Sequence, residues 1–180
     1  MQSLTDTPAA PLFHAPTFDG KRAIPSPAVT RIMLELLDLN PRDKLLEVGT
    51  GSGYQTEQFA ASGAEIHSIE LEPWVDSTKI IGECVFLHSG DGAVGLPPEA
   101  PFSAIVATCG VDEIPNAWRD QLSEGGRLVC PIGDAQSQRL TLFVKAKEEL
   151  IPSRIGAYVR FQMLREPPKP RPPKYCPDAR

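Results

Sequence analysis

The chain has 180 residues, of which 41% are hydrophobic, and a net charge of −5. This length suits one domain with a sheet covered by helices on both faces, and the composition is that of a globular chain, not a disordered one. The acidic balance argues against a nucleic-acid surface, and no apolar run reaches the roughly 18 residues of a membrane helix, so neither is expected as a partner.

The first residues, MQSLTDTPAAPLFHAP, lack the basic start and apolar core of a signal peptide. The four cysteines stand far apart with no CxxC pair, which favours reduced thiols over disulfides or metal ligands. We therefore expect a cytoplasmic protein without a metal.

Residues 1–25 are rich in Pro, Thr and Asp and predict an extended lead-in. Pro27 then suits a first helical turn, and apolar residues follow at helical spacing. Ser26 is therefore predicted to cap a helix that ends near Leu39, before Asn40-Pro41.

Apolar runs and amphipathic stretches alternate from there on. Strands are predicted over Lys44–Val48, Glu65–Ile69, Cys84–His88, Phe102–Thr108 and Arg127–Pro131, and helices over Tyr54–Ala61, Val75–Ile81 and Ile114–Leu122. Gly125-Gly126 is predicted to end the last helix, and Arg139–Lys145 and Tyr158–Leu164 to close the sheet as an antiparallel pair. This alternation predicts an α/β domain over residues 26–165, with a doubly wound, mostly parallel sheet.

Residues 166–180, EPPKPRPPKYCPDAR, contain six of the nineteen prolines. We interpret this segment as a solvated, polyproline-like tail. The alternative is a PxxP ligand for a partner domain.

The stretch LLEVGTGSGYQT places three glycines at alternate positions after a strand. A phosphate-binding P-loop would need Lys followed by Ser or Thr, which is missing. A dinucleotide fingerprint needs its third glycine where Tyr54 stands. A glycine turn without a ligand stays open, as does a site where the backbone approaches a ligand closely.

Three acids follow successive strands and favour the second possibility. Glu47 ends the first strand, where it can accept from a cationic amino-acid group, and Glu70 ends the second, where it can accept from both ribose hydroxyls. Asp91 follows the third strand and can accept from an adenine amino group. Together they predict a pocket for S-adenosylmethionine.

The chain resembles the protein-L-isoaspartate O-methyltransferases. The resemblance rests on GTGSGYQT, SIE, GDG, LPPEAPFSAIVAT, EIPNAWRDQLSEGGRLVCPIG and QRLTLFVK, in order and spacing, between about Ile24 and Leu164. It implies a seven-stranded class I methyltransferase fold. It also implies methyl transfer to the free carboxylate of an isoaspartyl residue in a protein or peptide, which starts the repair of damaged proteins.

The resemblance also implies a set of site residues. Those expected at the cofactor, besides Glu47, are Gly49, Thr50, Gly51, Ser52, Gly53, Gln55, Glu70, Leu71, Asp91 and Gly92. Thr108 is expected beside the transferred methyl group. No general base is required, because a carboxylate is already ionised at neutral pH.

The substrate half departs from the family pattern. The family's entrance segment resembles Gln-Thr-Ile-Ser-x-Pro, with hydroxyls that meet the substrate carboxylate, whereas this chain has RAIPSP. Near the end, AYVRFQML resembles the family's VRFVPL strand, with Gln162 and Met163 substituted. Arg22, Ile24, Pro25 and Arg160 are predicted at the substrate, with Ser26 beside the acceptor or only as a helix cap. Two alternatives therefore stay open: a relative with another dedicated acceptor, and an inactive cofactor-binding or interaction module.

Overall fold

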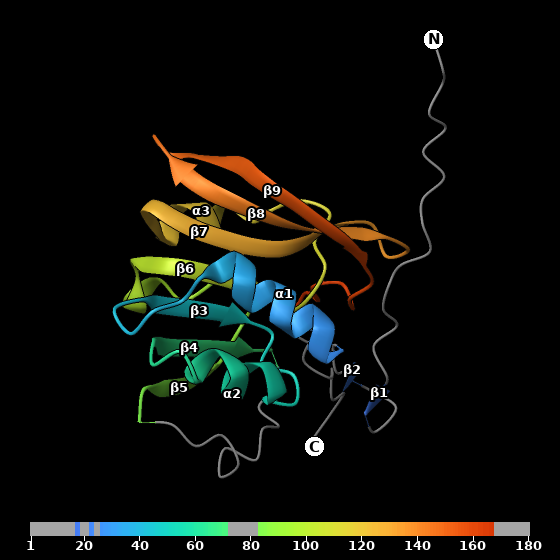
Figure 1. Ribbon diagram of the computed structural model, residues 1–180, viewed down its shortest axis with the longest axis horizontal. Coiled ribbons are helices and arrows are strands. Elements are labelled where there is room, and N and C mark those ends of the chain that lie inside the picture. The colour runs from blue at the N-terminus through green and yellow to red at the C-terminus, as the bar shows by residue number, and fades with distance from the viewer. Residues whose placement is uncertain (1–16, 19–21, 24–25, 72–82, 168–180) are drawn as a thin grey trace, which may run out of the picture.

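Seven strands form one sheet in the order β5-β4-β3-β6-β7-β8-β9 in the computed structural model, which describes residues 17–18, 22–23, 26–71 and 83–167 (Figure 1). The strands are β3 (Lys44–Val48), β4 (Glu65–Glu70), β5 (Val85–Ser89), β6 (Phe102–Ala107), β7 (Leu122–Gly133), β8 (Gln138–Ala146) and β9 (Glu149–Val159). The helices are α1 (Pro27–Leu37), α2 (Tyr54–Ala60), the short 3₁₀ helix η1 (Pro97–Glu99) and α3 (Asn116–Gln121). A separate antiparallel pair joins β1 (Thr17–Phe18) and β2 (Arg22–Ala23).

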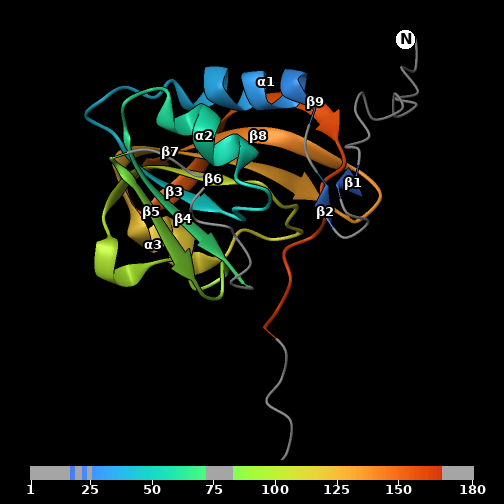
Figure 2. The ribbon, with the colours of Figure 1, turned by 90° about the horizontal axis from the view of Figure 1, so that it is seen from below.

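The sheet is parallel from β5 to β7 and antiparallel from β7 to β9. Parallel strands are joined by crossovers on the faces of the sheet, and Figure 2 shows α1 and α2 on one face with α3 on the other. The predicted doubly wound, mostly parallel seven-stranded fold is confirmed. The described part of the chain contains no helix long and apolar enough to span a membrane.

Alternate residues of the central strand supply two separate cores. Leu45 of β3 packs with α1 and α2 through Met33 and Phe59. Leu46 packs on the other face with a cluster that includes Trp118 of α3. This division gives every residue of β3 a defined face.

The predicted cap of the first helix is confirmed. Ser26 lies in extended conformation, and its hydroxyl accepts a hydrogen bond from the Val29 amide at 3.4 Å. The helix ends at Leu37, two residues before the predicted end, because Asp38 turns into the left-handed region with φ 47°.

The prediction for the last strand is wrong. The structure places it at Glu149–Val159 and not at Tyr158–Leu164. Lys147 and Glu148, with φ of 51° and 66°, form the two-residue turn that brings the chain straight back along β8. Pro152 and Gly156 interrupt the apolar pattern of this edge strand, which hides it in the sequence.

The boundary after the third helix is also shifted. Gly125-Gly126 is expected to separate the helix from its strand, but β7 already begins at Leu122, directly after α3. The two glycines lie inside an irregular section of β7, where the pairing with β6 shifts register and Gly125 has φ 74°. The predicted helix at 75–81 and most of the proline-rich tail lie outside the described residues.

Candidate functional site

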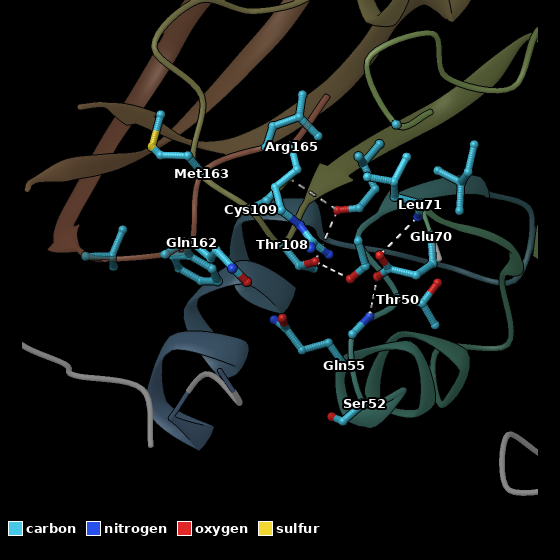
Figure 3. Close-up of a pocket in the computed structure, with 18 of the residues that line it drawn as sticks. Thr50, Ser52, Gln55, Glu70, Leu71, Thr108, Cys109, Gln162, Met163 and Arg165 are labelled. Carbon is cyan, nitrogen blue, oxygen red and sulfur yellow. Dashed lines mark hydrogen bonds between the residues drawn. The ribbon is translucent and has the colours of Figure 1, made fainter. Parts of the chain in front are cut away.

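A cavity lies at the carboxyl ends of β3 and β4 and beside the end of β6, where ligands bind in open parallel sheets (Figure 3). Of the site residues predicted from the sequence, those that line it are Ser26, Gly49, Thr50, Gly51, Ser52, Gln55, Glu70, Leu71, Gly92, Thr108 and Arg160. The structure therefore brings together residues that lie more than a hundred positions apart in the chain.

The glycine loop, residues 49–53, forms one wall of the cavity. Its glycines adopt backbone conformations that other residues avoid. Gly49, Gly51 and Gly53 have φ of 101°, 56° and 79°. A Cβ on Gly49 would lie 2.6 Å from Oγ1 of Thr108, so the loop and the end of β6 approach too closely for any side chain at this position. Gly53 lies off the cavity and is the N-cap residue of α2.

Glu70 joins the loop to the end of β4. Its Oε2 accepts from the Gly51 amide at 3.1 Å, and its Oε1 accepts from the Leu71 amide at 3.0 Å (Figure 3). Each carboxylate oxygen keeps a second acceptor position, so Glu70 can take two further donors such as the hydroxyls of a ribose. With a Cβ-free wall on one side and this acceptor pair on the other, the residues present fit the adenosyl part of S-adenosylmethionine.

Glu70→Ala should weaken the binding of S-adenosylhomocysteine strongly. A hydrogen bond to a charged group contributes about 1.5–3 kcal/mol, so a loss of roughly 10- to 100-fold in affinity is expected by titration calorimetry. Glu57→Ala is the matched control, because Glu57 is an exposed acid of α2 that does not line the cavity. Equal affinities for the two variants would show that Glu70 does not hold the ligand.

Glu47 does not line the cavity, contrary to its predicted contact with the ligand. The β3 pleat turns its side chain beneath α2, where it is fully buried. Its Oε2 accepts from Oγ1 of Thr56 at 2.5 Å and from Oγ of Ser68 at 2.6 Å, while Oε1 has no partner among the described residues. Burial raises the pKa of Glu47 to about 7, and the negative charge of Glu70 adds to the rise. The two hydrogen bonds act in the opposite direction and lower the pKa.

Asp91 also lies off the cavity. Its Oδ1 accepts from the Ala93 amide at 2.9 Å and so stabilises its own turn, while the adjoining Gly92 lines the cavity. Two side chains of α3 hold the rest of this loop. Nε1 of Trp118 donates to the Gly92 carbonyl at 2.8 Å, and the Gln121 amide bonds to the backbone of Val94 and Leu96, both at 2.8 Å.

Thr108 and Cys109 follow β6 at the floor of the cavity. The Thr108 hydroxyl donates to the Val48 carbonyl at 3.1 Å and also contacts the Gly49 carbonyl, so it ties the ends of β3 and β6 together. Burial raises the pKa of Cys109 to about 12. The thiol is therefore protonated at neutral pH and is not a nucleophile there.

The opposite wall comes from a segment that sequence analysis largely missed. Val159–Arg165 leaves β9 and crosses the cavity, and only Arg160 of it is predicted at the site. Its backbone bonds to Gly110, whose amide donates to the Gln162 carbonyl at 2.9 Å and whose carbonyl accepts from the Leu164 amide at 2.8 Å. A signal is present in the sequence, because AYVRFQML resembles a segment of the family, but its apolar pattern predicts a strand instead of a cavity wall.

Three predicted substrate residues are not placed at the cavity by the structure. Arg22 lies in β2, with its side chain outside the described residues, and Ile24 and Pro25 lie wholly outside them. Ser26 is the first described residue of the entrance segment that reaches the cavity. Nowhere in the described ranges do three or more His, Cys, Asp or Glu side chains gather in a way that could hold a metal.

Comparison with known proteins agrees with this geometry. The model of the protein-L-isoaspartate(D-aspartate) O-methyltransferase family matches residues 10–166. The chain belongs to this family. Protein-L-isoaspartate O-methyltransferase 1 of Syntrophobacter fumaroxidans is 37% identical over 154 residues, which cover 82% of this chain and 72% of the relative. The enzyme of Methanoculleus marisnigri is 40% identical over 141 residues, covering 73% of this chain and 63% of the relative.

Solved structures of protein-L-isoaspartate O-methyltransferases share the fold. One superposes with a TM-score of 0.72 at 28% identity, covering 83% of this chain, which spans about half (51%) of the solved chain. The Plasmodium falciparum protein, solved in complex with S-adenosyl-L-homocysteine, gives a TM-score of 0.68 at 20% identity and covers 87% and 80% of the two chains.

Proposed function

We propose that this chain transfers a methyl group from S-adenosylmethionine to the free carboxylate of an isoaspartyl residue in a protein or peptide. The observation that supports this most directly is the meeting of the glycine loop, Glu70 and Thr108 at one cavity in a chain of this family. The activity fits the site chemically, since an ionised carboxylate needs no general base and no histidine is among the described residues that line the cavity.

The chain's own residues would act by holding and orienting. S-adenosylmethionine, when bound, supplies an electrophilic methyl group on a positively charged sulfur. Glu70 and the Gly49–Gly51 backbone would hold the adenosyl end, and Thr108 would mark the floor beside the methyl group. Val159–Arg165 would cover the site and exclude water, which strengthens the attraction between the carboxylate and the sulfonium charge.

The acceptor carboxylate would enter from the side of Ser26 and Arg160. Both residues line the cavity, and a guanidinium pairs well with a carboxylate. We place Arg22, Ile24 and Pro25 in the same substrate region on the resemblance of RAIPSP to the family's entrance segment, with Ser26 as the only hydroxyl of that segment.

The test is methyl transfer from tritiated S-adenosylmethionine to a synthetic peptide containing isoaspartate, compared with its normal aspartyl twin. Base-labile label on the isoaspartyl peptide alone is expected, because a methyl ester hydrolyses in base. Equal label on both peptides, or label that resists base, would contradict the proposed acceptor.

A dedicated peptide acceptor is the second candidate. Arg160 and Arg165 both line the cavity, and their positive charges favour an acceptor with further negative charge. In that case, the isoaspartyl peptide stays unlabelled although S-adenosylhomocysteine binds.

We also propose a cytoplasmic location for the protein. We further propose a protein partner for the proline-rich tail, and a pull-down with the tail peptide would test this.

A further inference from the structure

A chain of hydroxyl groups connects the cavity to the buried carboxyl of Glu47. Thr50 lines the cavity, and its Oγ1 lies 2.7 Å from Oγ of Ser68 on β4. Ser68 in turn donates to Oε2 of Glu47 at 2.6 Å. Thr50, Ser68 and Glu47 are each no more than 3% exposed, so water does not compete for these bonds.

The direction of these hydrogen bonds depends on Glu47. An ionised carboxylate only accepts, and a serine hydroxyl has a single proton. When Ser68 donates a hydrogen bond to the ionised Glu47, it can only accept from Thr50. The Thr50 hydroxyl then donates to Ser68, and its oxygen keeps a lone pair for a donor in the cavity that Thr50 lines. A protonated Glu47 releases this constraint, since its own O–H can donate to Ser68.

We propose that Glu47 is a positioning residue which, through Ser68, makes the Thr50 hydroxyl a hydrogen-bond acceptor for a donor group of the bound cofactor. The proposal rests on the proposed function, because it assumes that S-adenosylmethionine occupies this cavity. It gives a role to a buried acid that contacts no ligand itself.

The surroundings of Glu47 make this device sensitive to pH. Thr56 faces it from α2, Ser68 faces it from β4, and Val106 is its partner on β6, so none of these three neighbours carries a charge. Glu70 at the end of β4 is the charged group that acts on it, and its like charge disfavours ionisation of Glu47. Ligand binding that needs the ionised form therefore releases a proton.

The sign of the pH dependence follows from linkage. The pKa of Glu47 is raised from 4.5 to about 7 in the folded chain. The folded state thus binds more protons than the unfolded state between these values, and the free energy of unfolding falls as the pH rises through this window. Affinity for S-adenosylhomocysteine should instead rise with pH around neutrality, because the binding-competent, ionised form becomes more populated.

Titration calorimetry with S-adenosylhomocysteine between about pH 6 and about pH 8, in buffers of different ionisation enthalpy, tests this directly. The unaltered chain should release a fraction of a proton on binding. Glu47→Gln keeps an acceptor for Ser68 but cannot ionise, so it should bind without proton release and with an affinity independent of pH. The free energy of unfolding of this variant should also no longer fall as the pH rises from about 4.5 to about 7.

Thr50, which reaches Glu47 through Ser68, and Thr56, which bonds to Glu47 directly, provide matched variants. Thr50→Val removes the hydroxyl that we assign to the ligand and should lower affinity roughly threefold to tenfold, with Thr50→Ser restoring it. Thr56→Val removes the other hydroxyl on Oε2 without altering the cavity wall. It should retain the pH dependence but shift it upward, because one bond that lowers the pKa of Glu47 is gone.

The outcomes separate this inference from the proposed function. Binding of S-adenosylhomocysteine with no proton release, or equal losses of affinity for Thr50→Val and Thr56→Val, would overturn the positioning role and leave the methyltransferase proposal intact. No binding by the unaltered chain at any pH would overturn the proposed function and this inference with it.

Discussion

Replacement of Gly49 by alanine is expected to abolish most cofactor binding while the chain still folds. The new Cβ would lie 2.6 Å from Oγ1 of Thr108, and the residue would keep an unfavourable φ of 101°. The left-handed conformation costs about 1–2 kcal/mol and overpacking about 1–3 kcal/mol. Relief of the clash must move the loop or Thr108, both of which form the cavity, so affinity for S-adenosylhomocysteine should fall at least about tenfold.

Gly125→Ala is the control that separates the effect of backbone strain on stability from an effect on the cofactor site. Gly125 also has positive φ, of 74°, but apart from its chain neighbours no described residue has an atom within 4 Å of the place that a Cβ would take. It does not line the cavity. This variant should lose about 1–2 kcal/mol of unfolding free energy and bind S-adenosylhomocysteine normally. If Gly49→Ala binds as tightly as Gly125→Ala, the glycine loop is not the cofactor wall.

Replacement of Trp118 by alanine is expected to cause the largest loss of stability. The side chain is fully buried in the core beneath the sheet, and its Nε1 is bonded to the Gly92 carbonyl. A Trp→Ala change in a core costs about 3–5 kcal/mol, which corresponds to a fall in Tm of about 6–20 °C for a chain of this size. Thermal unfolding followed by circular dichroism measures it.

Trp118→Phe isolates the hydrogen bond from the packing. It keeps most of the ring volume but leaves the Gly92 carbonyl without its donor, so a loss of about 1–3 kcal/mol is expected. Because Gly92 lines the cavity, this smaller change should also weaken S-adenosylhomocysteine binding. Equal losses of stability for the two variants would contradict the part that we assign to packing of the ring.

The cofactor half of the site could be predicted because its determinants are local in sequence. Three glycines at alternate positions after a strand permit a backbone conformation that few ligands require, and the structure gives all three positive φ. Glu70 follows from the same logic, since parallel strands place their carboxyl ends at one edge. Ser26 is identified as a cap by the Pro27 that follows it.

The features that sequence reasoning missed depend on side-chain direction and on long-range pairing. Glu47 and Val48 are neighbours on β3 but point to opposite faces, and only Val48 lines the cavity. Counting acids at strand ends cannot distinguish these faces. The Val159–Arg165 wall depends on the β8–β9 hairpin, whose position is set by a two-residue turn that carries no glycine.

The retained and altered halves of the site suggest where this chain differs from its relatives. By resemblance of the sequence, the loop, Glu70 and Thr108 keep the family pattern, whereas RAIPSP and the Gln162-Met163 pair depart from it. We assign both departures to the acceptor region, so we expect differences in acceptor preference and not in cofactor binding.

A crystal structure of the full chain with S-adenosylhomocysteine tests the central claim most directly. We predict that the ribose hydroxyls bind the Glu70 carboxylate, that the adenosyl part lies against the Gly49–Gly51 backbone, and that the sulfur faces Thr108. A ligand bound elsewhere, or a cavity filled by the protein's own side chains with Glu70 turned away, would contradict the account.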